Sequence, residues 1–93
     1  MKDKIKVLVK HPHEHPELQE IENSLEALQM IVGGHIETVT FNDIVVICNE
    51  EGRIQALDPN VAGFVGTIIF VGVDGTDFAD VPEDRIERLR MLL

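Results

Sequence analysis

The sequence predicts an α+β fold: a mostly antiparallel sheet of four to six strands with two helices, in a single domain covering residues 1–93. Three observations support it. Residues 4–10 alternate between apolar and charged side chains, as in a strand with one buried face. The pair Asn42-Asp43 separates two apolar runs, as in a hairpin. Two other segments repeat apolar residues at helical intervals. The expected order is strand, optional strand, helix, four strands and helix.

The first strand is expected at KIKVLVK, residues 4–10. Its lysines, Lys4, Lys6 and Lys10, are expected on the solvent face, where lysine guards a sheet edge against stray pairing. Prolines at positions 12 and 16 end the strand and make residues 11–16 a loop. The next run, LQEIE, is predicted to be either a short strand or the front of a helix.

The first helix is predicted over residues 24–32. Asn23 is expected to cap its first turn, with Glu26 at the spacing of a capping box. Leucines then recur at helical intervals. Gly33 and Gly34 should stop the helix, one of them in a left-handed conformation.

A meander of three strands is predicted next. HIETVTF and IVVIC form a hairpin across Asn42-Asp43, and the turn NEEG, with Gly52 in its permissive position, leads into RIQAL as the third strand. GTIIFVGV, residues 66–73, is a continuous apolar strand of the kind that is buried on both faces.

The chain is expected to close with a loop and a second helix. Pro82 suits the first turn of that helix, and acidic residues follow it at the positive end of the helix dipole. Ile86, Leu89 and Leu93 form the apolar stripe.

The amino-acid composition limits the classes of function that this chain can have. The net charge of −9 disfavours direct binding to nucleic acid. The partner is unknown: solubility alone explains the charge, and a basic protein partner is the alternative. The longest apolar run is far shorter than the roughly 20 residues that span a bilayer, so no membrane role is expected. The first residues carry charges and no cleavage site, and the chain has one cysteine, so a reducing, cytoplasmic setting is predicted.

Three alternating histidines, His11, His13 and His15, are the weak candidates for a metal site. In an extended segment their imidazoles would share one face and converge on an ion. The prolines beside them argue against a regular strand, and a surface loop lacks the partners that fix ring orientation. No functional metal site is therefore predicted.

No enzyme signature is visible, and no cofactor is expected. Cys48 lies in an apolar run without an activating base nearby in the sequence. The acidic stretch DGTDFADVPED does not have the spacing of a calcium loop, and the glycines of VGG follow a helix instead of opening one.

Two longer stretches, EIENSLEALQMIVGGHIE and VVICNEEGRIQALDPN, carry a family likeness. The chain resembles the family called domain of unknown function 3846, which occurs in phages, plasmids and conjugative elements and in their bacterial hosts. The likeness covers nearly the whole chain. It implies no established activity. This chain differs from the pattern at HPHEHP and is short between Asn60 and Gly66.

The polar residues that match the family pattern are the candidate ligand- or partner-binding residues: Gln29, Glu37, Asn49, Glu50 and Asn60. These residues also have structural explanations, as Asn49 suits the entry to a turn. Gln29 in particular would either bind a ligand or hold its helix to the following strand or to the Asn60 loop.

The first functional hypothesis is a non-enzymatic accessory module of phage or mobile-element type that works through protein contacts on its acidic surface. A sharper form is an inhibitor that presents DNA-like charge to a DNA-processing enzyme. The alternative is a small-molecule or nucleotide-binding domain that uses Gln29, Asn49 and Asn60 around the turns.

Overall fold

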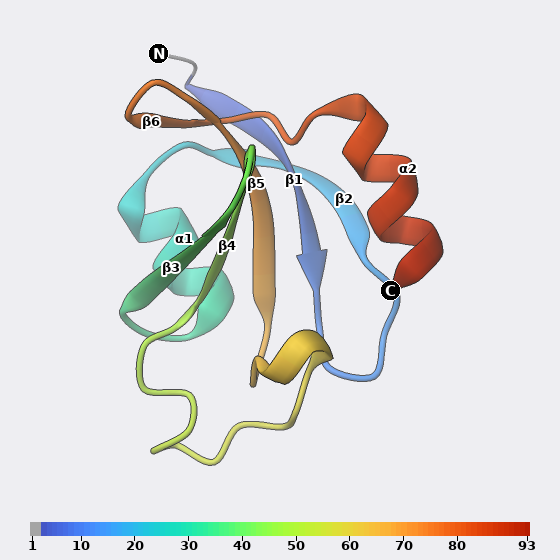
Figure 1. Ribbon diagram of the computed structural model, residues 1–93. Helices are drawn as coiled ribbons and strands as arrows, with labels where there is room; N and C mark the ends of the chain where they lie inside the picture. The colour runs from blue at the N-terminus through green and yellow to red at the C-terminus, as the bar shows by residue number, and fades with distance from the viewer. Residues whose placement is uncertain (1–2) are drawn as a thin grey trace.

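The computed structural model describes residues 3–93 and has the predicted α+β architecture (Figure 1). Within these residues six strands, two α-helices and one short 3₁₀ helix follow one another. They are β1 (Lys4–Lys10), β2 (Glu17–Glu22), α1 (Leu25–Val32), β3 (Ile36–Phe41), β4 (Ile44–Asn49), η1 (Val61–Gly63), β5 (Ile68–Asp74), β6 (Asp77–Ala79) and α2 (Glu83–Leu92).

The strands form one antiparallel sheet in the order β2-β1-β5-β4-β3. The short strand β6 folds back on the end of β5 and lies next to β1, where the N–H of Val81 donates to the carbonyl of Lys6 at 2.9 Å. As predicted from its unbroken apolar sequence, β5 is buried on both faces over residues 68–72. The sheet edges are β2 and β3.

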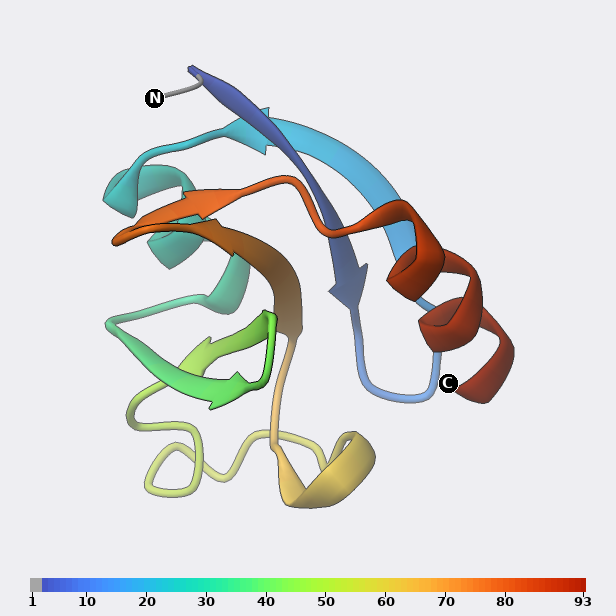
Figure 2. The same ribbon diagram turned by 45° about the horizontal axis from the view of Figure 1, so that its top comes forward.

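Helices cover opposite faces of the sheet (Figure 2). On one face α1 packs Leu28 and Val32 against the alternate residues of β1 that include Val7. On the other face α2 and η1 lie over a second apolar cluster around Phe70. No residue of α2 is fully buried, and it packs through Ile86, Leu89 and Leu93, the stripe predicted for it.

The lysines of β1 do not guard an edge. That prediction was wrong because LQEIE forms a strand, β2, which pairs along β1 and takes the edge position. Lys4 and Lys6 are exposed, but Lys10 is only 4% exposed and its ammonium group donates to the carbonyl of His11 at 2.9 Å.

The first helix is capped by Ser24 and not by Asn23. The Ser24 hydroxyl accepts a hydrogen bond from the N–H of Ala27 at 3.1 Å, while the Asn23 amide reaches across to the carbonyl of Phe78. The helix ends as predicted, since Gly33 is left-handed with φ of 81°.

The third strand of the predicted meander does not form. Residues 50–56 form consecutive turns, in which the N–H of Gln55 donates a hydrogen bond to the carbonyl of Glu51 at 2.9 Å. Ile54 in these turns is 82% exposed. The main-chain N–H of Leu57 donates to the carbonyl of Gly52 at 3.0 Å, so RIQAL forms hydrogen bonds within the turns instead of pairing with a strand. The predicted number of strands is still correct, because β6 forms where a loop was expected. The hairpin at Asn42-Asp43 is confirmed.

No helix within residues 3–93 has the length and apolar character needed to cross a bilayer.

Candidate functional site

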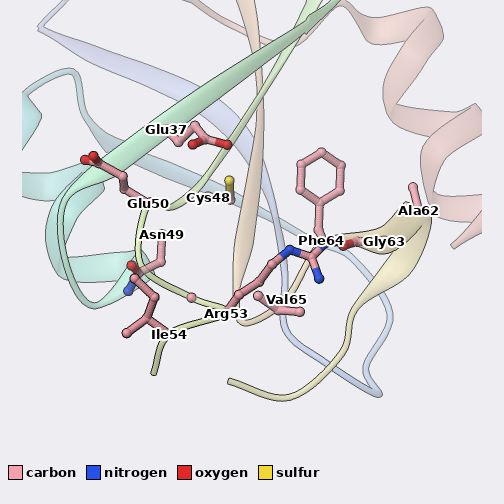
Figure 3. A pocket seen from close by; sticks show the side chains of 11 residues that line it. Glu37, Cys48, Asn49, Glu50, Arg53, Ile54, Ala62, Gly63, Phe64 and Val65 are labelled. Carbon is pink, nitrogen blue, oxygen red and sulfur yellow. Dashed lines mark hydrogen bonds between the residues drawn. The ribbon is translucent and has the colours of Figure 1, made fainter. Parts of the chain in front are cut away.

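Two hollows open on the α2 side of the sheet, and Ala62 and Phe64 line both of them. We call them the polar hollow and the apolar groove. The polar hollow has a volume of about 380 Å³ and lies between the β3–β4 pair and the turns after β4 (Figure 3). The apolar groove has a volume of about 420 Å³ and lies beneath α2.

The polar hollow brings together three of the five predicted site residues: Glu37, Asn49 and Glu50. Pairing in the sheet places Glu37 of β3 opposite Cys48 of β4, and Figure 3 shows both side chains at the wall of the hollow. Cys48 is 7% exposed. Burial raises the pKa of its thiol, and the nearby carboxylate of Glu37 raises it further. A protonated thiol is a poor nucleophile, so this arrangement does not activate Cys48.

Asn49 is 5% exposed, and its amide is used within the fold. Its Nδ2 donates to the carbonyl of Val32 at 3.2 Å and contacts the Oε1 of Gln55 at 3.4 Å. Its Oδ1 accepts from the N–H of Glu51 at 2.8 Å. Asn49 therefore fastens the last turn of α1 to the end of β4 and to the following turn, and does not present its amide to the hollow.

Asn60 lies outside the polar hollow and is also used structurally. Its Nδ2 donates to the carbonyls of Lys10 and Gly66 at 2.9 and 2.8 Å, and its Oδ1 accepts from the N–H of Val61. It joins the end of β1 to the segment that enters β5. The fifth residue, Gln29, lies in α1 and lines neither the hollow nor the groove, while its main-chain carbonyl accepts from Gly33 and Gly34.

These positions weigh against the small-molecule hypothesis as the sequence framed it. Gln29, Asn49 and Asn60 do not converge on one cavity, and two of their three amides already have partners. The polar hollow itself has mixed charges, with Glu37, Glu50 and Arg53 in its lining. The Arg53 guanidinium is held by the carbonyl of Gly63 at 2.7 Å.

The three alternating histidines do not form a shared face. Their segment is a loop with turns, and His13 has a left-handed backbone with φ of 66°. The ring of His11 is instead hydrogen-bonded to the hydroxyl of Thr67 at 2.8 Å. Residues 3–93 contain no group of three or more histidine, cysteine or acidic side chains arranged to hold a metal ion.

The apolar groove was not found by sequence reasoning. Its floor consists of side chains from β4 and β5, and its walls come from α2, from η1 and from Phe41 beside the hairpin turn. Two of its wall residues are large and exposed, since Phe41 is 52% and Leu92 77% exposed. Its lining residues are Phe41, Asn42, Ile44, Val46, Val61, Ala62, Phe64, Phe70, Arg85, Arg88, Leu89, Leu92 and Leu93.

Arginine is the only charged residue type in the groove lining. Arg85 and Arg88 contribute two positive charges there, in a chain whose net charge is −9. Arg85 pairs with Asp43 across 3.2 Å, but its Nε is buried and has no hydrogen-bond acceptor within residues 3–93. A buried donor without an acceptor is rare in folded proteins. The groove thus combines an apolar surface with two arginines, one of which has a buried nitrogen without an acceptor in the described residues.

One signal in the sequence could have indicated the groove. Met91 and Leu92 continue the apolar residues of α2 beyond the stripe that packs on the sheet, and the three arginines of the helix lie among them. Finding the groove also required knowing that the hairpin turn lies next to α2, which depends on how α2 lies over the sheet.

Comparison with known protein families agrees with the resemblance noted in the sequence. The model of the family described as domain of unknown function (DUF3846) matches residues 5–93, and the chain belongs to that family. Searches of curated proteins and of solved structures found no match.

Proposed function

We propose that this member of the DUF3846 family is a non-enzymatic interaction module that holds a segment of a partner protein in the apolar groove. The observation that supports it best is the composition of the groove: an apolar lining, with Arg85 and Arg88 as its only charged residues. An accessory role in the cytoplasm of a cell that carries a phage or mobile element, the setting that the resemblance implies, belongs to this proposal.

The groove suits a polypeptide segment with apolar side chains and at least one carboxylate. Apolar side chains would fill the space between α2 and Phe41, at a gain of roughly 25 cal/mol per Å² of apolar surface removed from water. A carboxylate at the rim could accept from Arg88 and from the exposed part of the Arg85 guanidinium, whose side chain is 36% exposed. Aromatic residues and arginine, both present in the groove, are enriched in protein interfaces.

A basic partner, with which the negative net charge is compatible, remains a prediction. The overall charge of −9 would steer such a partner at long range, whereas the groove selects what is held at short range. The two contributions differ in salt dependence. Steering weakens as salt screens it, and apolar contact does not.

Site-specific photo-crosslinking in the natural host cell tests the proposal. A photoreactive amino acid replaces Leu92 in the groove wall, or Met30 on the exposed side of α1 as a matched control, with exposures of 77% and 84%. We expect a discrete crosslinked protein from position 92, none from position 30, and loss of the product when Arg88→Glu is added. Equal products from both positions, or none from position 92, would contradict the proposal.

A further inference from the structure

The outer edge of β3 is unguarded, and this observation is independent of the apolar groove. β3 is the last strand of the sheet and pairs with β4 through all six of its residues, without a bulge. It contains neither proline nor lysine, and Glu37 is its single charged residue. Exposed edges of this kind are normally blunted, since they present free N–H and C=O groups to any other strand.

The opposite edge is different. β2 carries Glu17, Glu20 and Glu22 along its six residues and follows directly after Pro16. Pairing β2 with a copy of itself would bring these carboxylates together, and like charges on facing strands are destabilising. The chain therefore protects one edge of its sheet and leaves the other available.

Hydrogen bonding fixes which groups of β3 point outward. The N–H of Glu50 donates to the carbonyl of His35 at 2.8 Å, so residues 35 and 50 form a hydrogen-bonded pair. Such pairs alternate along an antiparallel ladder. Residues 37, 39 and 41 are therefore bonded to β4, and the main-chain groups of Ile36, Thr38 and Thr40 face away from the sheet.

We propose that β3 pairs antiparallel with β3 of a second copy of this chain, joining two sheets into one across a twofold axis at Val39. In this register the outward-facing Thr38 of each copy meets Thr40 of the other, and the two Val39 side chains meet each other. Glu37 lies opposite Phe41, so no like charges face each other. Threonine pairs and β-branched pairs stabilise neighbouring strands.

A second copy fits this edge better than an unrelated strand does because the sequence of β3 is complementary to itself in this register. One strand pair buries less than the roughly 1,200 Å² of a typical stable interface, so the dimer should dissociate on dilution. Each copy also carries a charge of −9. Association should therefore strengthen as salt screens the mutual repulsion, opposite to the behaviour of a partner attracted by charge.

Sedimentation of the purified chain over a concentration series, at about 50 mM and about 500 mM NaCl, tests the dimer. We expect twice the monomer mass at high concentration and tighter association at high salt. Thr38→Pro removes one outward N–H from each copy and should weaken association by about tenfold or more. Glu20 of β2 lies opposite Lys6 of β1, and the main-chain groups of Lys6 bond on the side away from β2, so the main-chain N–H of Glu20 points outward. Glu20→Pro removes this N–H and is the control. It should leave association unchanged.

A charge exchange tests the register without proline. Thr38 and Thr40 are exposed, so replacing both with lysine in one chain and both with glutamate in another should not disturb the fold. Each variant alone should stay monomeric, because like charges would face each other, and the mixture should form a mixed dimer at about 150 mM salt. A wild-type chain that stays monomeric at high concentration in high salt, or a mixture that does not associate, would overturn the proposal.

Discussion

The side-chain amide of Asn49 donates to the main-chain carbonyl of Val32 at 3.2 Å, which joins the end of β4 to the last turn of α1. A buried carbonyl at a helix end needs such a partner. Replacing Asn49 with alanine leaves that carbonyl and the N–H of Glu51 without their partner. We expect Asn49→Ala to lower the free energy of unfolding by about 2 kcal/mol, measured by urea denaturation.

Gln29→Leu is the matched comparison in α1. Gln29 is half-buried, and its main-chain carbonyl, which accepts from Gly33 and Gly34, is retained in the variant. We expect a change within about 0.5 kcal/mol. A loss for Gln29→Leu as large as that for Asn49→Ala would mean that the Gln29 side chain also fastens the helix.

Gly72 allows β6 to return close to β5. A Cβ at this position would overlap the main-chain oxygen of Asp80, which cannot move without breaking the adjacent bond between Val81 and Lys6. We expect Gly72→Ala to cost more than about 3 kcal/mol or to prevent folding. Gly75→Ala is the control, since its site is open and only its φ of +64° is unfavourable, which costs about 1 kcal/mol. Equal losses in thermal unfolding would refute the close approach.

The strands and helices were largely predictable because they follow local patterns. The unbroken apolar run of β5 and the glycine that ends α1 each specify their element without reference to the rest of the chain. RIQAL and β6 were misjudged for the opposite reason. Whether a short run becomes a strand depends on a neighbouring strand that offers free main-chain groups, and this is a property of strand order.

The same limit applied to the candidate site. Asn49 and Asn60 were selected because they match the family pattern, but the sequence does not show that their amides point into the fold. The groove residues come from four separate segments of the chain. Their proximity depends on how α2 lies over the sheet, and α2 makes only partly buried contacts there.

Cys48 should react slowly with thiol reagents. Burial and the carboxylate of Glu37 both raise its thiol pKa, so little thiolate is present near neutral pH. We expect Glu37→Gln to lower this pKa and to speed alkylation by iodoacetamide at a fixed, mildly alkaline pH. Glu50→Gln is the control, since Glu50 does not contribute to the shift. An alkylation rate that Glu37→Gln leaves unchanged would show that the Glu37 carboxylate does not raise the pKa of Cys48.

The same raised pKa makes stability depend on alkaline pH. The native thiol stays protonated at pH values where the thiol of the unfolded chain ionises, so the unfolded state binds fewer protons in that range. Stability from this group is full below the unfolded thiol pKa and falls as pH rises toward the raised native pKa. Urea denaturation across this range should show a smaller decline for Cys48→Ala than for the parent chain. Parallel declines would show that the thiol is not responsible.

Arg85 is expected to cost stability in the free protein. Its contact with Asp43 is partly exposed, at 36% and 50% for the two side chains, and such ion pairs contribute about 0–1 kcal/mol. Its buried Nε without an acceptor costs about 1–3 kcal/mol. Arg85→Met keeps the apolar stem, removes the unsatisfied donor and leaves Asp43 in contact with water. We therefore expect the free energy of unfolding to rise by about 1 kcal/mol, measured by urea denaturation.

Arg88→Met is the control for this prediction, because Arg88 is exposed and its loss should change stability by less than about 0.5 kcal/mol. If the groove holds a partner as proposed, both substitutions should reduce crosslinking from position 92, and only Arg85→Met should stabilise the free chain. Residues that bind a partner are commonly unfavourable for stability in its absence. A marked loss of stability in Arg85→Met would instead assign Arg85 to holding α2 on the sheet through Asp43.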